Sequence, residues 1–139
     1  MTKKFELLSD DTIVFWGRKL FRIRALISFG TIEKGDLGGY VEKEENLSQY
    51  DNAWVCDNAR VCGNARVKSS SDYIVFKNTW SSFRWFTYTK SNQKWKAGCF
   101  YGTGEELIKK AYEDSEKSGK HYELYVNLVA EMEKLEERE

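Results

Sequence analysis

Alternating apolar and polar positions mark the first 28 residues of the chain. Residues 12–16 and 20–26 are rich in β-branched and aromatic side chains, and Gly17 lies in the short segment between them. Two such runs joined by a few residues that include glycine predict a β-hairpin.

A glycine-rich segment follows the predicted hairpin. Residues 30–40 contain four glycines, and two of them, Gly38 and Gly39, are adjacent. Paired glycines are typical of turns in which the backbone needs a positive φ. The segment is therefore predicted to be a loop. Its spacing does not match a dinucleotide-binding fingerprint, and no helical pattern follows it directly.

A strict six-residue repeat comes next. Residues 51–56, 57–62 and 63–68 share the pattern D/G-N-A-W/R-V-x. In each unit alanine and valine are two positions apart, so both point to the same side of a short strand. Asn or Gly before each alanine suits a corner in the chain. Stepping back in sixes places Leu47 and Val41 at the equivalent position, so two degenerate units are expected to lead in.

This pattern resembles the hexapeptide repeats of left-handed parallel β-helices. In that family three hexapeptides make one triangular coil, and the resemblance implies about one and a half coils here. So short a coil cannot cover its own ends, so the segments before and after it are expected to cap it.

The next third of the chain predicts strands. Residues 72–77, 83–90 and 94–101 are rich in aromatic and β-branched side chains, and residues 91–93 form a turn between the last two runs. We expect the last two runs to pair as a β-hairpin.

Two helices are predicted at the C-terminus. Thr103 and Glu106 form a capping box at the start of the first helix, which we expect to end near Gly119. The last helix carries a heptad-like stripe, which is expected to pack on the C-terminal sheet or, alternatively, to form an oligomer seam. The stripe consists of His121, Tyr125, Leu128, Met132 and Leu135.

Together these elements predict an α+β fold that is mainly β with an α-helical C-terminus. Residues 1–40 form an N-terminal β-hairpin cap, and residues 41–70 form a short left-handed parallel β-helix. Residues 71–139 form a β-hairpin and two helices. A chain of 139 residues can bury enough surface to fold without a metal or a disulfide.

Charge and cysteine content narrow the compartment and the partners. The chain has 22 basic and 22 acidic residues, so no net charge draws it to nucleic acid or membrane. Residues 73–104 nevertheless hold five basic and no acidic side chains, and the following helices are acidic. An odd number of cysteines, without a signal peptide or a membrane-spanning run, predicts a cytoplasmic protein.

No residue set predicts catalysis, a cofactor or a metal site. Many long hexapeptide-repeat proteins are acyltransferases that use a histidine base beside the coil, but His121 lies outside the repeats. Cys56 and Cys62 occupy equivalent repeat positions and are expected to point outward from neighbouring edges, too far apart for a disulfide. Cys99 is expected to be a small buried apolar residue.

Aromatic and basic residues alternate between positions 73 and 101. If one face of this hairpin packs on the helices, the aromatic residues of the other face remain exposed and form a binding surface. Three interpretations stay open: a core role only, a protein partner or self-association, and stacking with single-stranded nucleic acid. The predicted partner-binding residues are Trp80, Arg84, Phe86, Tyr88 and Trp95.

The whole layout resembles a group of small phage and prophage proteins with an N-terminal cap, a truncated hexapeptide coil and a compact β-β-α-α tail. The resemblance covers nearly the whole chain and implies a fold and a phage context without an established reaction. The matching segments, besides the three repeats, are 22–26, 35–41, 46–48 and 98–103.

The resemblance implies a non-enzymatic binding protein in the cytoplasm of an infected or lysogenic bacterium. We expect it to dock on a host bacterial protein and inhibit it, for example a CRISPR or other antiviral defence nuclease. One alternative is a self-assembling homodimer or homotrimer built by stacking coils or pairing helices. Another is a sponge for a small ligand or nucleotide.

Overall fold

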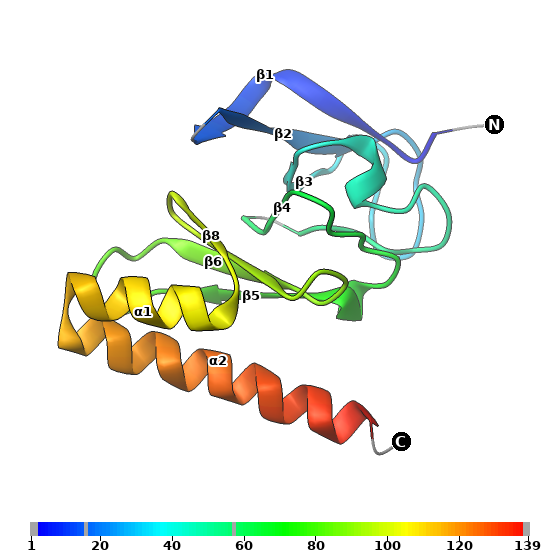
Figure 1. Ribbon diagram of the computed structural model, residues 1–139. Helices are drawn as coiled ribbons and strands as arrows, with labels where there is room; N and C mark the ends of the chain where they lie inside the picture. The colour runs from blue at the N-terminus through cyan, green and yellow to red at the C-terminus, as the bar shows by residue number, and fades with distance from the viewer. Residues whose placement is uncertain (1–2, 16, 57, 138–139) are drawn as a thin grey trace.

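The computed structural model describes residues 3–15, 17–56 and 58–137. Within these residues the chain forms eight strands in two sheets, followed by two helices (Figure 1). The predicted α+β class, rich in strands with a helical C-terminus, is confirmed.

The first sheet contains the predicted N-terminal hairpin. Its strand order is β1-β2-β3-β4, with the first three strands antiparallel and β3 parallel to β4. The hairpin is longer than the sequence indicated, because β1 begins at Phe5, and a register shift after Leu8 interrupts its pairing. Trp16, at the end of the predicted first strand, lies outside the described residues. The strands are β1 (Phe5–Phe15), β2 (Arg18–Ala25), β3 (Leu37–Val41) and β4 (Arg60–Val61).

The six-residue repeat forms a coil whose alanines and valines point inward. Val41 pairs in parallel with Val61, and Leu47 bridges to Val67, so the chain returns to the same place after 20 residues (41 to 61 and 47 to 67). Asp57, which opens the second repeat, lies outside the described residues. The interpretation of this coil as a left-handed parallel β-helix stays a prediction. The inward side chains are all buried: Ala53, Val55, Ala59, Val61, Ala65 and Val67.

Gly38 and Gly39 lie within β3, and the turn predicted for them was wrong. Neither has a positive φ. A Cβ at Gly38 would come within 2.6 Å of the Val55 carbonyl oxygen, and a Cβ at Gly39 would collide with the Ala59 carbonyl oxygen. These glycines are needed because the backbone of β3 runs directly against the backbone of the coil.

The second sheet is an antiparallel meander with strand order β5-β6-β7-β8. The predicted single return strand over residues 94–101 is two strands, because the chain turns back at Gly98, whose φ is 56°. The strands are β5 (Tyr73–Lys77), β6 (Trp85–Thr89), β7 (Lys94–Ala97) and β8 (Phe100–Gly102). Short 3-10 turns precede the coil repeats and this sheet at Glu44–Asn46 and Ser70–Asp72.

The two helices are α1 (Gly104–Asp114) and α2 (Glu116–Glu137). The capping box is confirmed: the Glu106 amide donates to Thr103 Oγ1 at 3.2 Å, and the Thr103 amide donates to Glu106 Oε1 at 2.9 Å. The predicted helix end at Gly119 was wrong. Gly119 is buried inside α2, where a Cβ would collide with the Tyr112 ring of α1, so this glycine permits the two helices to approach.

The second sheet is covered on both faces, which gives the molecule three layers (Figure 1). On one face, Phe86 and Trp95 pack with Val129 of α2. On the other face, the Thr87 hydroxyl accepts a hydrogen bond from the Arg60 amide at 3.0 Å and so joins β6 to the coil. The sheet between residues 73 and 102 is therefore an interior layer over much of its area.

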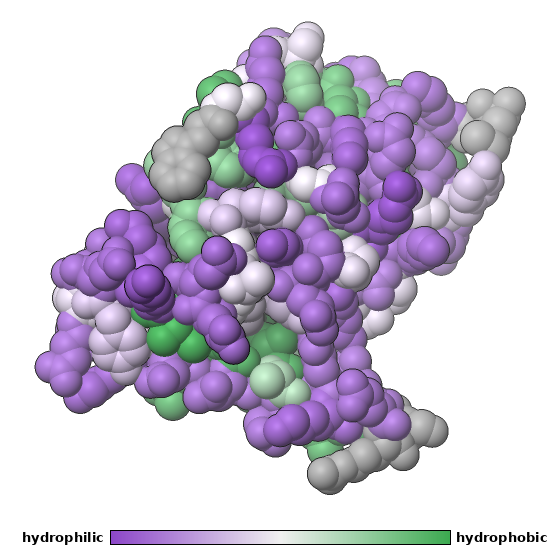
Figure 2. Space-filling model, in the orientation of Figure 1, coloured by the Kyte–Doolittle hydropathy of each residue, from purple (hydrophilic) through white to green (hydrophobic). Residues whose placement is uncertain are grey.

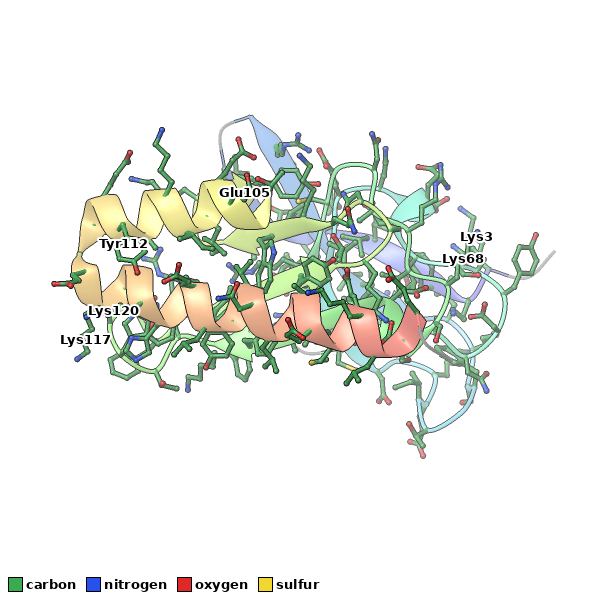
Figure 3. The ribbon with its side chains drawn as sticks, turned by 60° about the horizontal axis from the view of Figure 1, so that its bottom comes forward. Lys3, Lys68, Glu105, Tyr112, Lys117 and Lys120 are labelled. Atoms are coloured by element: carbon green, nitrogen blue, oxygen red, sulfur yellow. The ribbon has the colours of Figure 1, made fainter. Side chains whose placement is uncertain are left out.

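The outer face of α2 carries leucines. Figure 3 shows α1 and α2 in front of the sheet, with Lys117 and Lys120 near the junction of the two helices. The packing face of α2 consists of Gly119, Tyr122, Tyr125, Val126 and Val129. Of the predicted stripe, Tyr125 packs on the sheet and His121 stacks on Trp80, whereas Leu128 and Leu135 are exposed and Met132 is half-buried.

Candidate functional site

Three of the five predicted partner-binding residues are core residues. Phe86, Tyr88 and Trp95 are each at most 3 % exposed and lie beneath the helices. The Tyr88 hydroxyl also donates a short hydrogen bond to Glu133 of α2. The expectation that these side chains offer a binding surface was wrong, because the helices cover their face of the sheet and the coil covers the opposite face.

Trp80 also has an internal role. Its ring stacks on His121 with 4.3 Å between centroids, and its Nε1 donates to Ser118 Oγ at 3.0 Å. Both partners belong to α2, so Trp80 fastens the loop between β5 and β6 to that helix. Of the five predicted partner-binding residues, only Arg84 is exposed.

Arg84 belongs to an exposed patch. Phe83 is 63 % exposed and has φ of 57°, a left-handed conformation that is rare for a bulky residue. Trp85 begins β6, and the Lys77 ammonium lies 5.6 Å from the centre of its indole ring. We call Lys77, Phe83, Arg84 and Trp85 the Phe83 patch.

A group of cations lies beside this patch, between the second sheet and the coil. Lys96 of β7 is 3 % exposed, and its ammonium lies 3.9 Å from the centre of the Phe15 ring. Arg60 of β4 interacts electrostatically with both Lys96 and Arg84. Among the described residues, none forms an ion pair with Lys96, Arg60 or Arg84. We call these three residues the interlayer cations.

The surroundings of the interlayer cations perturb their acid–base behaviour. Burial, followed by repulsion from Arg60, lowers the pKa of Lys96 to about 8. Burial likewise lowers the pKa of Arg60. The neighbouring Cys62 thiol has its pKa raised to about 12 by burial, so it is neutral near pH 7 and supplies no counter-charge.

The cysteines differ from their predicted positions. Cys56 is exposed as expected, but Cys62 is buried among Phe15, Leu20 and Tyr40 because the N-terminal hairpin covers that edge of the coil. Cys99 is exposed in the turn between β7 and β8, so the buried role predicted for it was wrong. All three have free thiols.

The described surface also contains shallow hollows. One of about 510 Å³ lies at the end of the coil and includes Leu47, Tyr50 and Val67 in its wall. Another of about 470 Å³ lies between the β7–β8 turn and α1, and Cys99 contributes to its wall. Figure 2 shows a mainly hydrophilic face with a small apolar area over the helices.

Neither a metal centre nor a membrane span emerges from the residues that the structure describes. In those ranges, no group of three or more His, Cys, Asp or Glu side chains is placed to hold a metal ion. No described helix is long and apolar enough to cross a bilayer.

The interlayer cations were hard to find from sequence. The alternation Lys94-Trp95-Lys96 does indicate that Lys96 faces away from Trp95. What it cannot indicate is that Arg60, 36 positions earlier, meets the same face.

No family model, curated protein or solved structure matches the chain.

Proposed function

We propose that this chain is a non-enzymatic binding protein that docks on a host bacterial protein through the Phe83 patch and inhibits it. The phage resemblance of its sequence motifs motivates the host-directed role. The observation that carries the proposal is Phe83, a large aromatic side chain that is exposed and held at φ of 57°.

This conformation of Phe83 is unfavourable on two counts. A left-handed backbone costs a residue with a Cβ about 1 to 2 kcal/mol. Exposure also forgoes most of the roughly 2 kcal/mol that burial of a phenylalanine side chain provides. Backbone strain of this kind is concentrated at functional sites, and burial of the ring against a partner would offset both costs.

The charges around Phe83 indicate the chemistry of the partner surface. Lys77 and Arg84 are exposed beside it, and residues 73–104 contain no acidic side chain. The matching surface is an apolar recess flanked by carboxylates, because aromatic and arginine side chains form most binding hot spots and opposite charges favour encounter. An antiviral defence nuclease with such an acidic face is the class of target that we propose.

A capture experiment with matched variants tests this proposal. Tagged wild-type protein, Phe83→Asn, Arg84→Glu and the control Tyr50→Asn are incubated with nuclease-treated bacterial lysate. Tyr50 is similarly exposed, at 66 %, but lies at the end of the coil. We expect one host protein to be captured by wild type and Tyr50→Asn and lost by both patch variants. The wild-type protein should also inhibit the purified partner.

Two results would overturn the proposal. One is equal capture by Phe83→Asn and wild type, which would remove the patch from the interface. The other is capture from a parallel untreated lysate that is absent from the nuclease-treated lysate, which would favour nucleic acid as the partner.

Self-association through α2 is a second candidate. Leu124, Leu128 and Leu135 are exposed on the outer face of this helix, where a second copy could cover them. Light scattering at several protein concentrations tests it. A dimer or trimer that Leu128→Glu converts to a monomer would support this candidate, and a monomer at all concentrations would exclude it.

A further inference from the structure

Lys96 is a buried cation that lacks a charged partner among the described residues. Its side chain is 3 % exposed, and among the described residues its ammonium contacts the face of the Phe15 ring, at 3.9 Å from the ring centre. A desolvated cation–π contact is worth about 2 kcal/mol. Burying an ammonium costs several kcal/mol even after relaxation. The Phe15 ring therefore offsets only part of the cost.

Arg60 is incompletely satisfied in the same place. Its Nε is buried and has no hydrogen-bond partner in the part of the chain that the structure describes. Its backbone amide is fixed to Thr87 Oγ1 at 3.0 Å, so β4 holds this guanidinium against the second sheet. Arg84 supplies a third cation, on the solvent side of the pair.

The nearby carboxylates are already engaged with other groups. Asp11 accepts hydrogen bonds from Arg22 Nε at 2.7 Å and from the Tyr40 hydroxyl at 3.1 Å. Glu42 accepts from Arg18 Nη1 at 3.0 Å and from the Gly63 amide at 2.7 Å. The interlayer cations therefore have aromatic rings in place of carboxylates: the Arg60 guanidinium carbon lies 5.9 Å from the centre of the Tyr40 ring, and Lys96 lies over Phe15.

We propose that Lys96, Arg60 and Arg84 form a binding site for a small phosphate-bearing anion at the junction of the coil and the second sheet. This inference is independent of docking through Phe83, although Arg84 contributes to both. The two guanidinium groups can each donate paired hydrogen bonds to phosphate oxygens, and the ammonium adds a compact charge.

The depth of Lys96 favours a compact ligand over a polymer. A nucleic-acid backbone binds cations that line an open groove, whereas Lys96 lies between two layers with almost no exposed area. A free phosphate ion or the terminal phosphate of a nucleotide is a compact ligand of the matching charge. These two sources share the same chemistry and are separated by the test below.

The test measures the affinity of the full chain for inorganic phosphate, ATP and a single-stranded oligonucleotide at constant ionic strength. Phosphorus NMR and the shift in melting temperature provide two readouts. We expect phosphate or ATP to bind, and Lys96→Met and Arg60→Met each to weaken binding at least tenfold. The control Lys77→Met, which removes an exposed cation of the Phe83 patch, should bind like wild type.

Each outcome decides between defined alternatives. Tighter binding of ATP than of phosphate identifies a nucleotide, and equal binding identifies the free ion. Binding that is no stronger than that of chloride, or that survives Lys96→Met in a folded protein, overturns the site. An oligonucleotide that binds more tightly than both small anions overturns the preference for a compact ligand. Phe83→Asn should leave phosphate binding intact, so failure of this site and failure of the docking proposal are distinguishable.

Discussion

Lys4 and Lys96 are both buried, but the structure compensates their charges in opposite ways. The Lys4 ammonium donates to three backbone carbonyl oxygens, those of Ala53 at 2.6 Å, Tyr50 at 3.3 Å and Asp51 at 3.5 Å. Asp51 adds a carboxylate oxygen at 3.9 Å. Both ammonium groups lie over an aromatic ring, Phe29 for Lys4 and Phe15 for Lys96, but Lys96 has neighbouring cations in place of the carbonyl and carboxylate oxygens.

The contrast distinguishes a lysine that builds the fold from one that remains available to a ligand. Lys4 connects the start of the N-terminal strand to the loop that enters the repeats, and its charge is compensated by the oxygen atoms of that loop. Lys96 lies where the coil meets the second sheet, and no described residue forms an ion pair with its ammonium. A buried charge without a partner is costly, and such groups occur preferentially at functional sites.

The largest expected effect is on stability when each lysine is replaced by methionine. Lys4→Met leaves carbonyl oxygens without donors and should lower the free energy of unfolding by about 4 kcal/mol. Lys96→Met removes an uncompensated charge and should leave stability unchanged or raise it by about 1 kcal/mol. Urea denaturation at pH 7 in phosphate-free buffer measures both. Equal losses in the two variants would erase the distinction.

A second expectation concerns the closed packing on the Lys4 side of the molecule. Gly39→Ala forces a Cβ against the Ala59 carbonyl oxygen and should cost about 3 kcal/mol. Gly35→Ala is the matched control: it has φ of 96° but open space around it, and it should cost only about 1 kcal/mol. Urea denaturation of each variant and of wild type gives both changes in the free energy of unfolding. A milder effect at Gly39 would mean that β3 can move away from the coil.

The packing of β3 against the coil shows which structural features could be predicted from the sequence and which could not. The inward alanines and valines were predictable, because their alternation is a property of a short strand and the six-residue spacing repeats it. The Thr103 cap was predictable for the same reason, since its partners lie within three residues. The turn predicted at Gly38 and Gly39 was wrong, because the atoms that require glycine at these positions belong to residues 55 and 59.

The errors around the second sheet have the same physical origin. Alternation placed Phe86 and Tyr88 on one face of β6, which is correct, but it could not show that the helices cover that face and the coil covers the other. The sequence predicts a helix end at Gly119, but this glycine lies within α2, where a Cβ would collide with the Tyr112 ring of α1. The interlayer cations depend on contacts between segments distant in sequence, whereas the Phe83 patch lies within residues 77–85 and depends on the backbone conformation of Phe83.

The pH dependence of stability offers a smaller and more specific test of Lys96. Its pKa is lowered from 10.5 to about 8 in the folded chain, so between these values the unfolded chain binds more protons and stability rises with pH. The difference between wild type and Lys96→Met should grow by about 2 kcal/mol from pH 8 to 10.5, in favour of wild type. The charged and titratable groups facing Lys96 are Arg60, Arg84, Cys62 and Cys99.

Comparing the two proteins at each pH cancels the titration of other groups, including Lys4, whose pKa burial also lowers. Denaturation in urea at several pH values, without phosphate, provides the curve. A flat difference between wild type and Lys96→Met would show that the pKa of Lys96 is not lowered in the folded chain, so that its charge is compensated there.

The smallest expected effect is the change in stability when Phe83 is replaced by asparagine. Phe83→Asn keeps a side chain that tolerates a left-handed backbone, so it should relieve strain at φ of 57° and raise the free energy of unfolding by about 0.5 to 1 kcal/mol. The same substitution should abolish partner capture. A gain in stability together with a loss of binding is the signature of a residue retained for recognition. A loss of stability would instead place the Phe83 ring among the groups that hold the fold together.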